Sequence, residues 1–262
     1  MSSGNSAMQL ETGTGWSRGL NNLLRSELGR WFGTKQWWVQ ILIWSSIAVG
    51  IPLMAALATR DDEALPMAML FNAMLGIGGP IGVCILMQEA LVGEKRSGTA
   101  AWVLSKPVSR LAFLSGKLAA NVLGIVVTMV VVPGLLLYLA SALVTHTTLA
   151  PLGFLAGLGA HLVHLLFYVG LTLMLGSMSD QGGAVIGLPL AFLFGQQFLP
   201  SLHRGLANAI PYALTGGAEP SVTTALMYGM HPAAGYLPLV TTGLAAVLFV
   251  AIAIWVFRRQ DL

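Results

Sequence analysis

The chain has 262 residues, of which 56% are hydrophobic and only 9% are charged, with a net charge of +3. An average soluble domain has about 25% charged residues, so this composition excludes an ordinary water-soluble fold. A membrane-spanning helix needs about 20 mostly apolar residues, and the length therefore allows about six spans with short connections. The single cysteine, Cys84, lies in an apolar run and says nothing about the redox compartment.

The first 36 residues precede any apolar run that is long enough to cross a membrane. Residues 1–15 are polar and rich in glycine and serine, without the pattern of a secretory signal, and we expect a disordered tail. In residues 16–36, apolar side chains recur every three or four positions with basic residues between them. This pattern predicts an amphipathic helix that lies in the membrane interface; packing on a soluble partner is the alternative.

Apolar runs in residues 37–262 predict six membrane spans that form one all-α domain. Glycines and a proline at 76–80 in the second run indicate a kink or a close helix contact. The third run is too long for one straight crossing, so we expect its first two turns in the interface or beyond the membrane. The predicted spans are residues 37–58, 65–91, 111–144, 152–178, 182–198 and 236–257.

Residues 199–235, between the fifth and sixth spans, are mixed in polarity and contain several prolines. Two short helices fit this segment, near residues 201–213 and 221–230, and both are too short to cross. If the amino terminus is inside the cell, only Arg60 and Arg204 of the 13 lysines and arginines lie outside. The positive-inside rule therefore predicts that both termini are cytoplasmic and that the short helices are extracytoplasmic.

The largest connection on the predicted cytoplasmic side is residues 93–110, between the second and third spans. Its basic residues surround a short apolar core, from Ala100 to Leu104, which fits a helix of two turns. Pro107 disfavours helical conformation in the residue before it and therefore ends this helix. Such a helix would present an apolar ridge and a charged rim to a cytoplasmic partner. A surface loop whose charges only set the topology is the alternative.

The residues of this connection resemble the signature of the type-two ABC exporter permeases. That signature runs from an acidic residue through Gly-Thr, Leu, a small residue and Pro-Val-Ser-Arg to Gly-Lys. In size and layout the chain is similar to the permeases of nitrous-oxide-reductase maturation transporters. The matching residues are Glu94, Gly98, Thr99, Leu104, Ser105, Pro107, Val108, Ser109, Arg110, Phe113, Gly116 and Lys117.

The resemblance implies that residues 97–104 form a coupling helix that docks on a separate ATPase subunit, and that Glu94 pairs with Arg25 or Arg30 of the entry helix. It implies a dimer, expected to be a homodimer, in a bacterial or archaeal cytoplasmic membrane, with the substrate path between protomers. Membrane lipid is the other expected partner; we expect no cofactor, metal or nucleic acid. Trp102 is the strongest candidate anchor, since a buried indole is a common interface hot spot. The candidate coupling residues are Glu94, Gly98, Thr99, Trp102, Leu104, Pro107 and Arg110.

The sequence lacks the phosphate-binding loop Gly-x4-Gly-Lys-Ser/Thr, because Gly116-Lys117 has no glycine at the required spacing and is followed by Leu118. We therefore expect no enzymatic activity in this chain and ATP hydrolysis in a partner. A secondary transporter driven by an ion gradient is the main alternative, although such proteins usually bury acidic residues at mid-membrane. An intramembrane serine protease fits poorly, since Ser177 and the histidines of the fourth span share one helix.

Polar residues in the predicted spans are candidates for lining a substrate path. Ionisable groups inside a membrane are costly and often functional. His161 and His164 lie on one helix face, where they would line a path, share a metal ion or simply pack. Interhelical hydrogen bonds explain the amides equally well. The candidate path residues are Asn72, Asn121, His161, His164 and Gln196.

Overall fold

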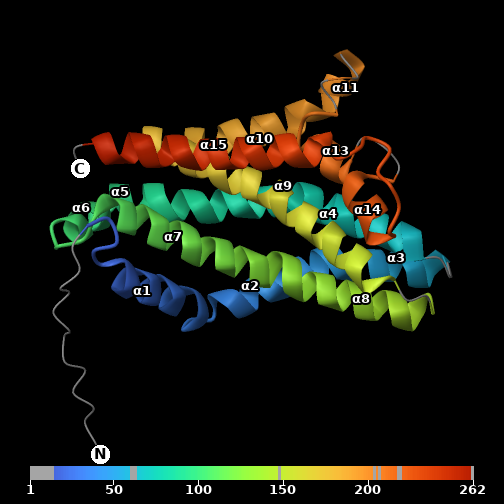
Figure 1. Ribbon diagram of the computed structural model, residues 1–262. Helices are drawn as coiled ribbons and strands as arrows, with labels where there is room; N and C mark the ends of the chain where they lie inside the picture. The colour runs from blue at the N-terminus through green and yellow to red at the C-terminus, as the bar shows by residue number, and fades with distance from the viewer. Residues whose placement is uncertain are drawn as a thin grey trace, which may run out of the picture.

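The computed structural model describes residues 15–59, 64–146, 149–202, 205, 208–216 and 220–260. Within this part the chain forms helices and no strands, which confirms the all-α class. The long helices run side by side in one elongated bundle (Figure 1). Except for Gly15, the predicted tail lies outside the described residues.

The described residues contain six helical stretches that are long and apolar enough to cross a membrane. Their number confirms the six predicted spans, and the second is five residues longer than predicted. Spans one to six are Gln36–Ala58, Leu65–Arg96, Arg110–Val144, Pro151–Met178, Gly182–Ser201 and Leu237–Arg259.

Several spans are divided into consecutive helical elements. Span one contains α2 (Gln36–Ser45), η1 (Ser46–Gly50) and α3 (Ile51–Thr59). Span two contains α4 (Ala64–Gln88), η2 (Glu89–Gly93) and α5 (Glu94–Arg96), and span three contains α7 (Arg110–Ile125), η3 (Val126–Val131) and α8 (Val132–Val144). Span four is α9 (Pro151–Met178), span five runs through α10 (Gly182–Gly195), η4 (Gln196–Phe198) and α11 (Leu199–Leu202), and span six is α15 (Leu237–Arg259).

The central helix of the bundle is α9, which packs against α4, α10 and α15. Glycines allow these helices to approach closely. A Cβ atom on Gly170 of α9 would lie 2.8 Å from the carbonyl oxygen of Ala246 in α15. A Cβ on Gly79 of α4 would lie 2.7 Å from a methyl group of Leu165. The close contact predicted for the glycines of span two is therefore confirmed.

The entry helix α1 (Leu20–Phe32) packs along α7, where it meets residues from Gly116 to Gly124. Glu27 and Trp31 form its buried face, and the helix is shorter than the predicted stretch of residues 16–36. Span three has 35 residues, and at about 1.5 Å per residue it is longer than a hydrocarbon core of about 30 Å. The location of its first two turns, in the interface or beyond the membrane, stays a prediction. The location of α1 in the interface stays a prediction.

The two ends of the bundle are different. The end with α6 (Thr99–Leu104), the 179–181 turn and Gln260 is here called the α6 end. The opposite end carries α13 (Tyr212–Thr215) and α14 (Val222–Met227) and is called the α14 end (Figure 1).

The prediction for residues 221–230 is confirmed by α14, which Ser221 caps by accepting a hydrogen bond from the Thr224 amide. The helix ends before Gly229, which has a φ of 66°. A single helix over 201–213 is wrong, because residues 208–211 form turns and α13 starts only at Tyr212. Pro211 explains the break, since proline disfavours helix in the residue before it.

Candidate functional site

The helix predicted at 97–104 is confirmed as α6, which begins two residues later, at Thr99. Gly98 precedes it with a φ of 73°, a conformation that glycine adopts without strain. At the other end, Ser105 donates a hydrogen bond from its side chain to the Trp102 carbonyl at 2.7 Å. The helix stops there, two residues before Pro107, as the sequence predicted.

The apolar residues of α6 divide between two faces. Ala100 is buried, and Val103 and Leu104 pack partly buried against the core of the bundle. Trp102 faces outward and is 61% exposed. The Lys106 ammonium lies 3.4 Å from the centroid of its ring, a cation–π contact. The outer face of α6 therefore offers one large aromatic side chain with a basic neighbour, rather than a continuous apolar ridge.

Glu94 belongs to a charge cluster that joins three helices. Its carboxylate accepts a hydrogen bond from Arg30 of α1 at 3.2 Å, so Arg30 is the partner among the two predicted arginines. The same carboxylate contacts the Lys117 ammonium of α7, which also lies 2.6 Å from Glu27 of α1. The Glu94 cluster, defined as Glu27, Arg30, Glu94 and Lys117, holds α1 and α7 against the start of the connection.

Sequence reasoning missed Lys117 as a member of this cluster, because it considered this lysine only as part of the permease signature, of the charge bias and of a possible phosphate-binding motif. The available signal was the register of the lysine. Lys117 lies four residues after Phe113 and four before Asn121, on the same face of α7, and all three are buried.

The next two residues of the connection fasten the end of α9. The Lys95 ammonium donates to the Gly176 and Ser177 carbonyls at 3.2 and 3.4 Å, and it lies 2.9 Å from the Asp180 carboxylate. Carbonyls in the last turn of a helix lack partners within the helix, so the lysine caps α9. The Arg96 guanidinium donates to the Asp180 backbone carbonyl at 2.8 Å.

At its other end the connection fastens the turn before α1 and the end of α15. Ser109 caps α7 by accepting from the Ala112 amide, and its own amide donates to the Arg18 carbonyl at 3.1 Å. Arg110 donates to the Arg258 carbonyl at 3.2 Å and to the Gln260 carbonyl. The 94–110 segment is therefore bonded to α1, α7, α9 and the end of α15.

The two asparagines among the candidate path residues have interhelical or local hydrogen bonds. Asn72 of α4 donates to the Thr224 hydroxyl of α14 at 2.9 Å. Asn121 of α7 accepts from the Trp31 indole at 3.1 Å and donates to the Lys117 carbonyl at 2.8 Å. Asn121 therefore seats α1 on α7, apart from the other candidates.

His161 and His164 are fully buried on α9, with ring centroids 5.8 Å apart. His164 Nε2 lies 3.1 Å from the Gly76 carbonyl of α4, whereas neither ring nitrogen of His161 has a partner among the described residues. In that part of the chain, no group of three His, Cys, Asp or Glu residues is arranged to hold a metal ion. The two histidines therefore lie at the α4–α9 interface, and among the described residues no His, Cys, Asp or Glu joins them to complete a metal site.

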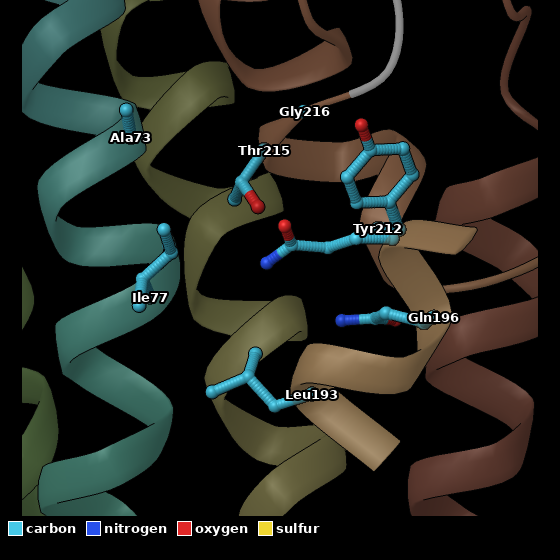
Figure 2. Close-up of a pocket in the computed structure, with 9 residues that line it drawn as sticks. Ala73, Ile77, Leu193, Gln196, Tyr212, Thr215 and Gly216 are labelled. Atoms are coloured by element: carbon cyan, nitrogen blue, oxygen red, sulfur yellow. The ribbon is translucent and has the colours of Figure 1, made fainter. Parts of the chain in front are cut away.

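Gln196 lies where span five bends into η4, and its amide donates to the Tyr168 hydroxyl at 2.9 Å. It also lines a cavity of about 140 Å³ between α4, α10 and α13. Figure 2 shows Ala73 and Ile77 of α4 on one side of this cavity, with Tyr212 and Gln196 on the other. Gly76 also lines this cavity, and its carbonyl is the group that His164 contacts.

Neither the models of known protein families nor the curated proteins include a match to this chain.

Proposed function

We propose that this chain is the membrane permease subunit of an ABC exporter and that it docks on a separate ATPase chain through α6. One observation carries the proposal: the 94–110 segment is bonded to α1, α7, α9 and α15, while Trp102 remains exposed on its outer face. A partner that binds Trp102 would therefore pull on the ends of several spans at once. A chain that receives its energy from a separate ATPase needs a mechanical connection of this kind between the docking helix and the spans.

The charge distribution supports an orientation with the α6 end in the cytoplasm. Eleven lysines and arginines precede span one, end span six, or lie in or beside the connection between spans two and three. All these positions belong to one side of a six-span protein, and basic residues favour the cytoplasmic side. The proposal places the protein in a bacterial or archaeal cytoplasmic membrane, in contact with lipid and a second copy of itself, with both termini inside.

The test is to co-express the chain with candidate ABC ATPase subunits from the same genome and to purify the pair. Hot-spot residues contribute about 2 kcal/mol or more, so Trp102→Ala should weaken ATPase binding by at least about tenfold. Trp38→Ala is the matched control, because Trp38 of α2 is similarly exposed, at 55%, but lies outside the 94–110 segment. This control should bind the ATPase as the unmodified chain does.

Two results would overturn the proposal in different ways. Unchanged ATPase binding and transport in both Trp102→Ala and Glu94→Ala would remove the docking role of the 94–110 segment. If no ATPase binds the unmodified chain, the exporter proposal fails. Transport driven by an ion gradient would then be the function to test.

A further inference from the structure

Two exposed tryptophans near the α6 end each carry a cation over the ring. The Lys106 ammonium lies 3.4 Å from the ring centroid of Trp102, and the guanidinium carbon of Arg259 lies 4.0 Å from that of Trp255. The two indoles are similarly exposed, at 61% and 56%. Their surroundings are different, and this difference indicates what each pair binds.

Trp255 continues an exposed apolar face of α15. Apolar residues recur along this face every three or four positions, which places them on one side of the helix. A tryptophan near the end of a span, with a long cationic side chain beside it, is typical of the membrane–water interface. The Trp255–Arg259 pair therefore fits the boundary of the lipid. The exposed face consists of Leu244, Leu248, Ala251 and Trp255.

Trp102 has no such apolar face around it. Membrane binding by an interfacial helix increases with the apolar area that it buries, and one indole on a helix of six residues offers little. A single large aromatic side chain among small neighbours is instead the pattern of a hot spot that fills a pocket in a protein partner. The other exposed residues of α6 and its flanking turns, apart from Lys106 and Pro107, are Ser97, Gly98, Thr99, Ala101 and Ser105.

The backbone fixes Lys106 beside Trp102. The Lys106 amide donates to the Val103 carbonyl at 3.2 Å, and the Lys106 carbonyl accepts from the Val108 amide at 2.6 Å. Lys106 is the only charged residue in positions 97–107, and its ammonium pairs with no carboxylate among the described residues. A protein surface that closes over the indole would also cover this charge, which is costly unless a carboxylate compensates it.

We propose that the ATPase surface that receives α6 is an apolar pocket for the Trp102 indole, with an aspartate or glutamate at its rim that pairs with Lys106. This inference rests on the exporter proposal and adds the chemistry of the partner surface. Charge pairs at the rim of an interface set the association rate and the choice of partner more than the affinity. Trp102 therefore holds the ATPase, and Lys106 selects it.

Association rates test this pairing, measured by surface plasmon resonance between the full-length chain in detergent and the ATPase that co-expression recovers. At about 0.05 M salt, Lys106→Gln should lower the association rate constant at least about threefold and Lys106→Glu at least about tenfold. Lys106→Arg keeps the charge and should stay within about twofold of the unmodified chain. Raising the salt to about 0.5 M should remove most of these differences, because it screens exposed charges.

Arg259→Gln and Arg259→Glu are the matched controls, since Arg259 makes the same kind of contact with Trp255 on the apolar face of α15. Both should associate with the ATPase as the unmodified chain does. A second arm of the experiment locates the acid on the ATPase. Each exposed aspartate and glutamate of the ATPase is changed to lysine and combined with Lys106→Glu. One of these reversals should restore at least about half of the lost association rate; if none does, the pairing is wrong.

Three further outcomes would overturn the inference. Association of Lys106→Glu at the unmodified rate would show that no acid faces this position. Equal, salt-independent losses in Lys106→Gln and Lys106→Glu would show that the lysine only holds the Trp102 ring. An effect that appears in nanodiscs with phosphatidylglycerol but not in detergent would show that the lysine faces lipid.

The two proposals fail in distinguishable ways. If the ATPase binds and Trp102→Ala weakens binding while the Lys106 variants behave as in any of these outcomes, only the acidic rim is excluded and the exporter proposal stands. If no ATPase binds the unmodified chain, both proposals fall.

Discussion

Lys117 of α7 and Glu27 of α1 form an ion pair of 2.6 Å in the interior of the α6 end, where the lysine side chain is only 2% exposed. The same ammonium contacts Glu94, and Arg30 bonds to both carboxylates. The Glu94 cluster therefore contains two acids and two bases, and its central charge is Lys117. The entry helix, the proposed coupling segment and span three all meet at this one lysine.

Lys117→Met should lower the free energy of unfolding by about 3–5 kcal/mol, because the buried Glu27 carboxylate and the partly buried Glu94 carboxylate would lose their shared partner. Arg30 compensates only in part, since its side chain is 44% exposed. Thermal unfolding in detergent, followed by circular dichroism, measures the loss. Lys35→Met is the control at an exposed position and should change stability by less than about 0.5 kcal/mol. Equal melting temperatures for the two variants would show that the cluster does not stabilise the fold.

The buried hydrogen bond from Trp31 to Asn121 gives a second prediction. Trp31→Phe keeps an aromatic ring against α7 but leaves the Asn121 carbonyl without its donor, which should cost about 1–3 kcal/mol. Trp38→Phe, at an exposed position in α2, should be nearly neutral. Adding Asn121→Leu to Trp31→Phe should recover part of the loss, because the unpaired carbonyl is then removed. A double variant that is less stable than Trp31→Phe would contradict this explanation.

The sequence predicts the spans well because each depends on a local property, the length of an apolar run. The same holds for α6, where an apolar core of five residues is followed by Pro107. The prediction is less reliable for a helix that the sequence continues through a proline. The prediction at 201–213 continued the helix through Ile210 and Pro211, where the chain instead forms turns.

Tertiary partners are the part that the sequence does not predict. Asn121 and Gln196 are both amides in apolar runs, but one is bonded to an indole 90 residues away and the other lines a cavity. The difference arises from which helices pack on each face, and this information is not present in either helix alone. The Glu94–Arg30 pair was expected only because the resemblance to a family supplied it.

Lys95 and Asp180 form an ion pair whose two members should contribute unequally. The Lys95 side chain is 5% exposed and also caps the Gly176 and Ser177 carbonyls, whereas the Asp180 side chain is 73% exposed. Lys95→Met should therefore cost about 1–3 kcal/mol through the lost carbonyl bonds. Asp180→Asn should cost less than about 1 kcal/mol, since exposed ion pairs contribute little. Thermal unfolding of both variants checks the order; a larger loss in Asp180→Asn would show that the ion pair, and not the cap, holds α9.

Two glycines in α9 provide a test of how α14 is seated. A Cβ on Gly157 would lie 2.7 Å from the Thr223 carbonyl and 3.0 Å from the Met227 amide, and these backbone atoms of α14 cannot move separately. Gly157→Ala should therefore displace α14 and cost about 1–3 kcal/mol.

Gly159 lies two residues further along the same helix, where a Cβ would meet no atom within 4 Å. Gly159→Ala should be neutral or should stabilise the protein by up to about 1 kcal/mol, because alanine favours helix over glycine. The melting temperatures of the two alanine variants should therefore move in opposite directions, or only that of Gly157→Ala should fall. Since α14 also accepts the hydrogen bond from Asn72, Gly157→Ala should disturb this contact and Gly159→Ala should leave it unchanged. Equal losses of stability in the two variants would show that glycine is needed for the flexibility of α9 and not for the contact with α14.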